Sequence, residues 1–399
     1  MAKRLLSILL AVILCGVSIC SCNNGGNGEN DSGVSSDVPA LGDDVPEVDF
    51  TVALVTDPGE IDTMQALVFL RDGISEFTDE TGAEFFISAA SKADDSSRER
   101  ALTYAIEDGA DVIVAFGMFY AEIISDICDI YPHITFLVIA TDTSYIGKNV
   151  SCLFFREEEA GFLAGYAAVM EGYRHLGFFG SPFSSIVGRS GCGFVQGADY
   201  AAKTLGVTDE VSVRYEYDEI AAYSDALTEE IGTWYSEGVE LIFTAGSTVC
   251  RSVADAALRS DGAVIGFDID RSEESGVYLT STVKNYDAIV YFALSRIFEN
   301  SGKLPDEMAG KRVRIGVEAD SIGLSDIDGS SGFVKFRAAD YDEILTKMKN
   351  GEIYIDDTAL ESYMPPVEIN VYGENADDGE TDDIEEGDDA DEINDTEET

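Results

Sequence analysis

Residues 50–55, Phe-Thr-Val-Ala-Leu-Val, form a nearly continuous apolar run, and residues 63–81 behind it repeat apolar side chains at helical spacing. A run of this length is typical of a strand buried on both faces, and a strand followed by a helix is the repeating unit of parallel sheets. The alternation continues along the chain. It predicts further strands at 84–88, 112–115, 135–139 and 150–154, with helices at 96–107 and 121–131.

The same alternation starts again after residue 154. It predicts helices at 160–171, 191–205, 223–237 and 250–259, and strands at 175–179, 211–215, 241–244, 263–267 and 277–280. We therefore predict an α/β fold with two doubly wound, Rossmann-like lobes in series. Ligands of open α/β sheets bind beyond the carboxyl ends of the strands, so we expect a ligand in a cleft between the lobes.

The chain is strongly acidic. Its 399 residues include 77 Asp and Glu against 25 Lys and Arg, which gives a net charge of −52 at pH 7. A field of that sign repels phosphates, which argues against a nucleic-acid partner and against attachment to anionic lipid through basic patches. Residues 374–399 hold 15 of the acidic side chains and no Lys or Arg, so we expect this stretch to be a disordered, solvated tail.

The N-terminus has the pattern of a secretory signal. Lys3 and Arg4 precede an apolar run at 5–19 that is too short for a permanent membrane span. The run ends in Ile-Cys-Ser-Cys, and Cys22 resembles the acylated cysteine in the lipobox of bacterial lipoproteins. We expect a signal peptide at 1–21, lipidation of Cys22, a flexible tether at 22–47, and attachment to the extracytoplasmic face of a bacterial membrane. The alternative is an ordinary signal peptide with incidental cysteines.

Catalytic and metal chemistry have little support in the sequence. The chain has two histidines, and neither HExxH nor Gly-x-Ser-x-Gly spacing occurs. We therefore expect no enzyme activity, no cofactor and no metal site. Four cysteines lack CxxC spacing and lie in apolar or Gly-rich stretches, so we expect free, buried thiols. They are Cys128, Cys152, Cys192 and Cys250.

Six short motifs are more specific. They are Val-Thr-Asp-Pro-Gly-Glu-Ile-Asp at 55–62, Phe-Gly at 116–117, Glu-Glu-Glu-Ala-Gly-Phe-Leu-Ala-Gly at 157–165, Gly-Cys-Gly-Phe-Val-Gln-Gly at 191–197, Ile-Gly-Phe-Asp-Ile-Asp at 265–270 and Thr-Ser-Thr-Val-Lys-Asn at 280–285. Together, and in this order, they resemble the basic membrane protein family of substrate-binding lipoproteins, also called the purine nucleoside receptor A-like family. The resemblance covers 52–285 and weakens toward residue 355.

The resemblance implies a type I periplasmic-binding-protein fold in which the chain crosses between the lobes three times. We place these crossings near 154–159, 281–285 and 313–317. Lobe 1 then comprises 48–156 with 285–315, and lobe 2 comprises 157–282 with about 316–373. Family members hand solutes, commonly purine nucleosides, to an ABC importer. The implied partners are therefore a nucleoside or related polyhydroxylated solute, an ABC permease and its ATPase.

Candidate binding residues follow the predicted strands. Asp57 can accept hydrogen bonds from two ligand hydroxyl or ring N–H groups, or it can cap the next helix, and Asp62 has the same two interpretations. In the family, the acid equivalent to Asp268 holds ribose hydroxyls, whereas Asp270 is more typical of a turn. Lys284 lies on the second crossing, where its ammonium group can reach both lobes, or it is a solvated lysine.

Two glycines and two apolar residues complete the candidate site. Gly117 and Gly246 let backbone N–H groups approach a ligand, or they serve only the turns. Met118 and Phe119 follow Gly117 and can line a ligand pocket or belong to the core. Phe183 has the same two interpretations.

The chain departs from the family where the base is held. The family pattern Ser-Phe-Asn is Gln65-Ala66-Leu67 here, and the Arg-Phe before the fourth motif is Arg189-Ser190. Both aromatic walls expected to stack on a purine are thus missing from these positions, and each such face contributes about 1–3 kcal/mol in nucleic-acid binding proteins. Met118, Phe119 and Phe183 are candidate replacements.

Two functions remain open from the sequence. The first is a lipid-anchored solute-binding protein of an ABC importer that binds a nucleoside-like molecule between the lobes. The alternative is an envelope sensor or surface protein of the same fold that binds a sugar or another polar solute. The missing aromatic residues favour the alternative, whereas Asp57, Asp268 and Lys284 favour a polyhydroxylated ligand.

Overall fold

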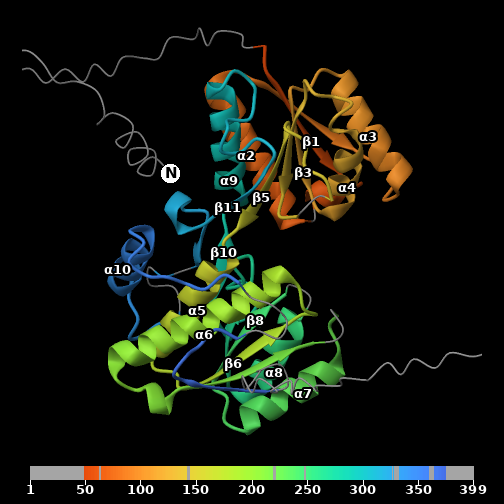
Figure 1. The fold of residues 1–399 in the computed structure, drawn as a ribbon. Coiled ribbons are helices and arrows are strands. Elements are labelled where there is room, and N and C mark those ends of the chain that lie inside the picture. The colour runs from red at the N-terminus through yellow and green to blue at the C-terminus, as the bar shows by residue number, and fades with distance from the viewer. Residues whose placement is uncertain are drawn as a thin grey trace, which may run out of the picture. The chain divides into compact units, whose positions relative to one another are not determined.

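The computed structural model of the chain describes residues 49–62, 64–141, 144–218, 222–246, 249–325, 327, 332–358 and 364–373, without the side chain of Asp62. The strands of these residues form two sheets in which most neighbours are parallel, and helices pack beside them (Figure 1). This confirms the predicted α/β fold class. The predicted signal peptide, tether, lipidated Cys22 and acidic tail lie outside the described residues.

The first sheet has the strand order β11-β5-β4-β3-β1-β2, and its strands are parallel. Its strands are β1 (Thr51–Thr56), β2 (Glu84–Ala89), β3 (Val112–Phe116), β4 (Thr135–Ile139), β5 (Val150–Phe155) and β11 (Lys311–Ile315). Its helices are α2 (Gln65–Thr81), α3 (Asp95–Glu107), α4 (Met118–Ile127) and α9 (Tyr286–Glu299), and the 3-10 turn η2 (Glu60–Asp62) follows β1. Because β1 and β3 are parallel neighbours, the residues after them lie at one edge of the sheet.

The second sheet has the order β12-β10-β9-β8-β6-β7-β13, in which only the pairing of β12 with β10 is antiparallel among the described strands. Its strands are β6 (His175–Gly180), β7 (Ser212–Tyr217), β8 (Leu241–Ala245), β9 (Ala263–Gly266), β10 (Tyr278–Lys284), β12 (Ile322–Leu324) and β13 (Asn370–Tyr372). Its helices are α5 (Glu157–Glu171), α6 (Ser185–Leu205), α7 (Asp225–Ser236), α8 (Cys250–Ser260) and α10 (Ala338–Lys349), with 3-10 turns η3 (Thr208–Glu210) and η4 (Val317–Ala319).

The described chain passes between the two sheets three times. It leaves β5 through Arg156 into α5, returns from β10 through Asn285 into α9, and leaves β11 through Gly316 toward β12. Backbone hydrogen bonds tie these passages to one another. The N–H of Arg156 donates to the carbonyl of Ile315 at 3.0 Å, and the N–H of Asn285 donates to that of Ser321 at 2.8 Å.

Aromatic and thiol side chains fill the interior of both sheets. Phe50, Phe77 and Phe298 meet edge to face beside the first sheet, and the one tryptophan of the chain, Trp234, is fully buried against Phe179 beside the second. As predicted, the four cysteines that the structure describes are buried, and none of them is in a disulfide. Burial of this kind supplies most of the free energy that holds such a fold together.

Helices α5 and α6 cross at unusually short range because glycines line both contact faces. A Cβ atom added at Gly165 would lie 2.0 Å from the carbonyl oxygen of Phe194, and one added at Gly197 would lie 2.0 Å from that of Phe162. This contact explains why α6 begins at Ser185, about six residues before the predicted start. The Gly-rich stretch at 188–193 lies wholly inside the helix, which Ser184 caps by accepting a hydrogen bond from the N–H of Val187.

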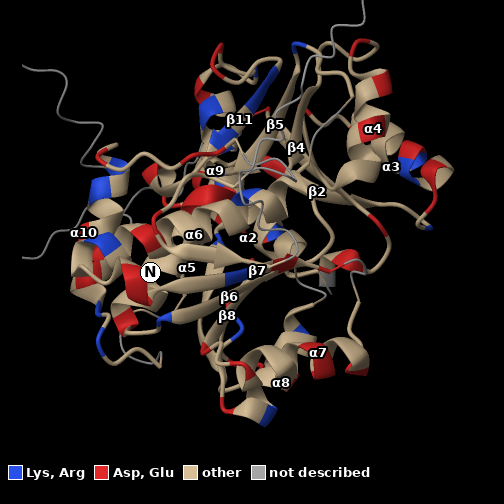
Figure 2. Cartoon of the chain, turned by 60° about the horizontal axis from the view of Figure 1, so that its bottom comes forward, with Lys and Arg blue, Asp and Glu red and all other residues tan. Residues whose placement is uncertain are grey.

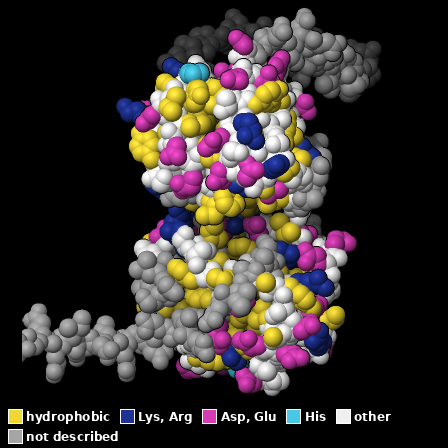
Figure 3. Space-filling view, turned by 90° about the vertical axis from the view of Figure 1, so that its right-hand side faces the viewer, with side chains coloured by type: hydrophobic (Ala, Val, Ile, Leu, Met, Phe, Trp, Pro, Cys, Tyr) yellow, Lys and Arg dark blue, Asp and Glu magenta, His cyan; other side chains and the backbone are white. Residues whose placement is uncertain are grey.

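Acidic side chains are spread over the described helices and loops of both sheets, and basic side chains are interspersed among them (Figure 2). The face drawn in Figure 3 likewise shows Lys and Arg scattered between acidic and apolar side chains. Within the part of the chain that the structure describes, no helix is long and apolar enough to cross a membrane.

The α5–α6 contact predicts a sharp difference between two Gly→Ala substitutions. G165A should lower the free energy of unfolding by about 2 kcal/mol or more, because its methyl group has no space between the helices. G232A is the matched control in α7, where a Cβ atom meets nothing within 4 Å, and it should stabilise the protein by about 0.5–1 kcal/mol. Denaturant unfolding of the two variants measures this, and similar values for both would contradict the close contact.

Candidate functional site

Two groups of polar side chains lie at the carboxyl ends of the central strands, one at each sheet. We call Asp57, Arg98, Gly117, Phe119 and Tyr120 the first half-site. Asp57 follows β1 and Gly117 follows β3, so the parallel pairing of these strands brings them to one edge. We call Glu157, Gly246, Asp268, Lys284 and Tyr286 the second half-site. Gly246 follows β8, Asp268 is the second residue after the neighbouring β9, and Lys284 ends β10 beside it.

In the first half-site, Asp57 is held by Arg98 of α3. The Nε of Arg98 donates to both carboxylate oxygens at 2.9 and 3.1 Å, and its Nη2 donates to Oδ2 at 2.5 Å. Both side chains are buried, with exposed fractions of 8% for Asp57 and 6% for Arg98. A planar fork on a carboxylate is the strongest geometry for such a pair, and breaking a buried pair leaves an uncompensated charge.

Arg98 reaches this position because it shares the buried face of α3 with Ala101, Leu102 and Ala105. Its Nη1 donates to Asp95 at 3.1 Å, an exposed carboxylate at the start of the same helix. Hydrogen bonds to Asp57 raise the pKa of Arg98 and outweigh the opposing effect of burial. The guanidinium group is therefore held in its charged form.

Phe119 and Tyr120 complete the first half-site. Gly117 takes a positive φ of 87° and lets α4 begin at Met118, so that Met118 and Phe119 emerge at the strand end with exposed fractions of 62% and 57%. The Cζ of Arg98 lies 4.2 Å from the ring centroid of Phe119. Tyr120 is buried and its hydroxyl donates to Oδ1 of Asp57 at 3.4 Å. The candidates Asp57, Gly117 and Phe119 are thus brought together.

In the second half-site, Asp268 is fixed in an uncommon backbone conformation. Its φ is 74°, which places its carboxylate toward Lys284 and Tyr286. Oδ1 lies 2.9 Å from Nζ of Lys284 and accepts a hydrogen bond from the Tyr286 hydroxyl at 3.3 Å. Positive φ at a non-glycine residue is costly and is maintained by the surroundings, here by contacts that orient a carboxylate.

Lys284 is buried, which excludes the interpretation of a solvated lysine. Its Nζ is shared between Asp268 and Glu157, which lies at 2.9 Å in the first turn of α5. Burial opposes the charge of Lys284, but the two carboxylates raise its pKa well above the usual value. One ammonium group cannot neutralise two carboxylates, and burial raises the pKa of Glu157 to about 7. The Oε2 atom of Glu157 is buried without a hydrogen-bond partner among the described residues.

Tyr286 connects the second half-site to the end of β3 in the first sheet. Its ring packs edge to face on Phe116, the last residue of β3, with the centroids 5.8 Å apart, and on Phe155 at 4.9 Å. Its hydroxyl reaches Asp268, which belongs to the second half-site. The side chain before Gly117 is therefore linked through one tyrosine to the acid that holds Lys284.

The two glutamates after Glu157 hold the third passage. The carboxylate of Glu158 pairs with Arg314 of β11, and Arg314 also pairs with Asp357. Glu159 accepts a hydrogen bond from the N–H of Val317 at 2.8 Å. Burial raises the pKa of Glu158, and it raises that of Glu159 to about 7. Three consecutive glutamates thus bind partners on two different passages.

The remaining candidates are placed as follows. Gly246 has a φ of 137°, and a Cβ atom added there would lie 2.5 Å from Oγ of Ser181, so the turn and this contact both require glycine. The side chain of Asp62 lies outside what the structure describes. Asp270 is exposed and accepts a hydrogen bond from the N–H of Ser272, which is the turn geometry expected. Among the groups that the structure describes, these three residues offer a ligand no more than their backbone.

The positions where the family has stacking aromatics face the interior here. Ala66 and Leu67 are buried in the core beside α2, and Ser190 is buried with its hydroxyl donating to the carbonyl of Ile186 in its own helix. Phe183 is partly buried, at the start of α6, and packs edge to face on Tyr217 with the centroids 5.5 Å apart. Together with the exposed Phe119, it leaves aromatic surface at the strand ends of both sheets.

Sequence reasoning missed Arg98, Tyr120, Glu157 and Tyr286. A signal for Arg98 was present, because it falls on the apolar face of α3 at the spacing of Ala101, Leu102 and Ala105. For Glu157 the sequence indicated only a favourable helix start. Acidic residues in the first turn of a helix are stabilised by the helix dipole and need no partner. No local pattern marks Tyr286.

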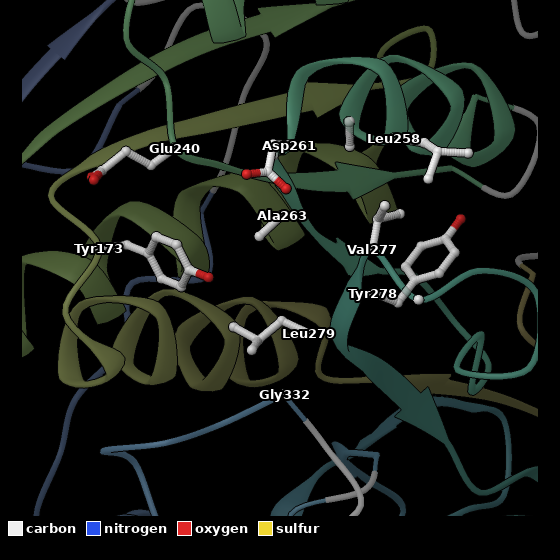
Figure 4. A pocket seen from close by; sticks show the side chains of 12 residues that line it. Tyr173, Glu240, Leu258, Asp261, Ala263, Val277, Tyr278, Leu279 and Gly332 are labelled. Carbon is white, nitrogen blue, oxygen red and sulfur yellow. The ribbon is translucent and has the colours of Figure 1, made fainter.

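A separate hollow of about 500 Å³ lies at the opposite end of the second sheet. It is bordered by Glu240 and Ala263 at the N-terminal ends of β8 and β9, and Tyr173 and Tyr278 lie on either side of Ala263 (Figure 4). The Glu240 carboxylate accepts hydrogen bonds from the N–H groups of Arg174 and His175. The half-sites lie at the carboxyl ends of the strands, so the hollow is not part of either of them.

The fold agrees with what comparison with known proteins gives. Residues 50–359, more than half of the chain, match the family model described as "ABC transporter substrate-binding protein PnrA-like". The chain belongs to this family. Its members are solute-binding components of ABC transporters, which implies a small-molecule solute and an ABC permease as partners, and a place outside the cytoplasm. It is a family of binding proteins and not a class of enzymes.

Curated relatives are similar over much of the chain. A Listeria innocua protein named "CD4+ T-cell-stimulating antigen" is 27% identical over 380 residues, covering 89% of this chain and 99% of the relative. "Basic membrane protein B" of Borreliella afzelii is 29% identical over 225 residues, covering 55% of this chain and 63% of the relative. A Pyrococcus abyssi relative, 24% identical over 57% of each chain, is named an uncharacterized lipoprotein.

Solved structures support the fold. An ABC transporter solute-binding protein from Conexibacter woesei superposes with a TM-score of 0.61 at 18% identity, covering 78% of this chain and all of the other. One from Aeropyrum pernix gives 0.56 at 19% identity, covering 76% and 92%. At these identities the similarity shows the fold alone, which is the predicted type I periplasmic-binding-protein fold.

The shared ammonium group predicts how the stability of this solute-binding protein depends on pH. The folded pKa of Glu157, about 7, lies above its usual 4.5, so between these values the folded state retains a proton that the unfolded state has lost. Stability from this proton is present below pH 4.5 and is lost as the pH rises to 7, by at most about 1.4 kcal/mol per pH unit. In E157Q this contribution is absent, so its unfolding free energy should fall less between pH 5 and 7.

Denaturant unfolding at several pH values from 5 to 8 measures the difference in slope. Glu159 titrates in the same range in both proteins, so the comparison isolates Glu157. E229Q, on the exposed surface of α7, is the matched control and should keep the wild-type slope. Parallel profiles for wild type and E157Q would show that Glu157 retains no such proton.

Proposed function

We propose that this chain is the lipid-anchored solute-binding component of an ABC importer and that its solute is a nucleoside-like molecule. The observation that carries the proposal is the hydrogen bonding of the Asp268 carboxylate. Its Oδ1 is fixed by Lys284 and Tyr286, whereas its Oδ2 has no hydrogen bond from any described residue. A carboxylate with one oxygen anchored and the other open is suited to accept the two hydroxyl protons of a vicinal diol.

Aromatic surface at both strand ends supports a ring next to the diol. Phe119 is exposed beside Asp57, and Phe183 is backed by Tyr217 near the start of α6. These side chains take the place of the aromatic residues that the family carries at the positions of Ala66 and Ser190. Stacking needs a flat face and tolerates different bases, so the location of the aromatic residue can change while the ligand class stays the same.

A second candidate function is retained because one observation favours it. Ala66, Leu67 and Ser190 are buried and present no ring to a ligand. A protein of this fold that binds a sugar or another polar solute, and that acts as an envelope sensor or surface protein, requires the acids but not two stacking faces. The two candidates differ in the solute that they bind, and a binding screen separates them.

The anchor is proposed from the N-terminal sequence. Cys22 follows a short apolar segment with Ser21 directly before it, and the Pyrococcus abyssi relative is named a lipoprotein. A diacylated cysteine would hold the protein at the extracytoplasmic face of a membrane while residues 22–47 act as a tether. This arrangement keeps a binding protein close to its permease.

Thermal-shift screening of the full chain against nucleosides, free bases, pentoses and hexoses tests the solute class, with affinities then measured by calorimetry. A nucleoside present at 100 times its Kd should stabilise the folded protein by about 2.7 kcal/mol. D268N should weaken binding by about 10- to 100-fold, the loss of a hydrogen bond to a charged group. D270N is the matched control and should bind as the wild type does. Shifts with sugars and none with nucleosides would favour the second candidate.

The anchor has its own test. In a bacterial host that processes lipoproteins, the wild-type chain should partition into the detergent phase and gain the mass of an acylated N-terminal cysteine at residue 22. C22S should lose the acyl mass, because no thiol remains at residue 22 to carry it. Mass spectrometry is the readout for this variant, since an uncleaved apolar run at 5–19 can itself enter detergent. C20S serves as the control and should remain acylated. Acylation that persists in C22S would place the anchor elsewhere.

A further inference from the structure

Asp57 and Asp268, the aspartates of the two half-sites, are chemically identical. They differ in how many further hydrogen bonds their carboxylates can accept. A carboxylate offers about four acceptor positions. On Asp57, Arg98 fills three of them and the Tyr120 hydroxyl, at 3.4 Å, takes the fourth. The Tyr120 contact is long and can be exchanged. Asp57 can therefore accept one further donor at most, fewer than the two hydrogen bonds considered for it from the sequence.

Arg98 retains hydrogen-bond donors at the edge of the same site. A guanidinium group has five N–H donors, and the partners of Arg98 account for three of them. Its Nη1 points toward Asp95, whose side chain is 81% exposed. An ion pair with so exposed a partner contributes little, so a ligand acceptor can replace Asp95 at Nη1.

The exposed ring of Phe119 lies next to this donor and acceptor. One face of the ring is covered by the guanidinium group, whose Cζ is 4.2 Å from the centroid, while 57% of the residue is exposed. The cation holds the ring in place and leaves the remainder available for stacking. The first half-site thus offers a flat apolar surface bordered by one donor and one acceptor.

We propose that Arg98 is a specificity-determining residue, which together with Asp57 binds the edge of a planar heterocycle that carries a hydrogen-bond acceptor beside a ring N–H. The ring stacks on Phe119, Nη1 of Arg98 donates to the ligand acceptor, and Asp57 accepts from the ligand N–H. The hydroxyl groups of the same ligand then bind Asp268, whose Oδ2 accepts no hydrogen bond from the residues that the structure describes. This inference rests on the proposed nucleoside-like solute and goes further by assigning each part of it to a half-site.

Two nucleosides that differ only at the ring edge test the assignment. Inosine carries a carbonyl oxygen beside a ring N–H, whereas purine riboside lacks both and has the same ribose. Calorimetry on the full-length wild type should show inosine bound about tenfold or more tightly, the difference expected for one hydrogen bond to a charged group. R98K keeps the charge but has no planar fork, so it should bind the two nucleosides with nearly equal affinity.

Controls separate recognition from folding. R100K, on the same helix, should keep the wild-type preference, since Arg100 contacts Ser96 and Ser97 and not Asp57. If R98K unfolds, the double variant D57N/R98Q removes both buried charges together, and it too should lose the preference for inosine while still binding purine riboside.

Each outcome decides the matter. A wild type that binds both nucleosides equally, or an R98K variant that keeps the full preference, would overturn the role of Arg98 while leaving nucleoside binding intact. A wild type that binds neither nucleoside would overturn the proposed solute itself, and this inference with it. Loss of the preference in R98K alone, with purine riboside binding retained, would support it.

Discussion

The buried ammonium group of Lys284 is the constraint on which the arrangement of the two sheets depends. It ends the strand that leaves the second sheet, and it binds Glu157, where the chain has just left the first. Replacing an ion pair of this kind by apolar residues often costs little, but removing one partner costs about 3–5 kcal/mol because a bare charge is left inside. The pair therefore fixes geometry more than it adds stability. With Lys284 in place, Asp268 and the first turn of α5 have defined positions.

The other contacts between the passages follow from the geometry of helix α5. Successive residues of an α-helix point about 100° apart, so three consecutive glutamates at the start of α5 reach in three directions. Glu157 meets Lys284, Glu158 meets Arg314, and Glu159 meets the backbone at Val317. The glycine contacts with α6 then hold α5 against the second sheet, so this turn has little freedom to move. The first turn of α5 lies on the first passage and thereby binds residues of the second and third passages.

How far the sequence predicts the structure depends on the range of the interaction. Buried parallel strands appear in the sequence as continuous apolar runs. For most strands, the predicted limits differ from the observed ones by one or two residues, because burial on both faces is a local property of composition. The start of α6 was missed because glycine disfavours helix locally, while the reason for its glycines is a contact with another helix. The partners of Glu158 and Glu159 lie 156 and 158 residues away along the chain, and no local pattern encodes such a pairing.

The same limit explains the difference between the two acids. By sequence, Asp57 and Asp268 are equivalent, since each follows a buried strand in a matched motif. In three dimensions, Asp57 is neutralised by a forked arginine on a neighbouring helix, and Asp268 shares an ammonium group with a second carboxylate. The first half-site is therefore close to neutral and donates as well as accepts, whereas the second has two carboxyl groups for one ammonium group and mainly accepts. In a chain with a net charge of −52, this division concentrates donor capacity beside Phe119, which is the property on which the proposed solute, with a ring at one end and hydroxyl groups at the other, depends.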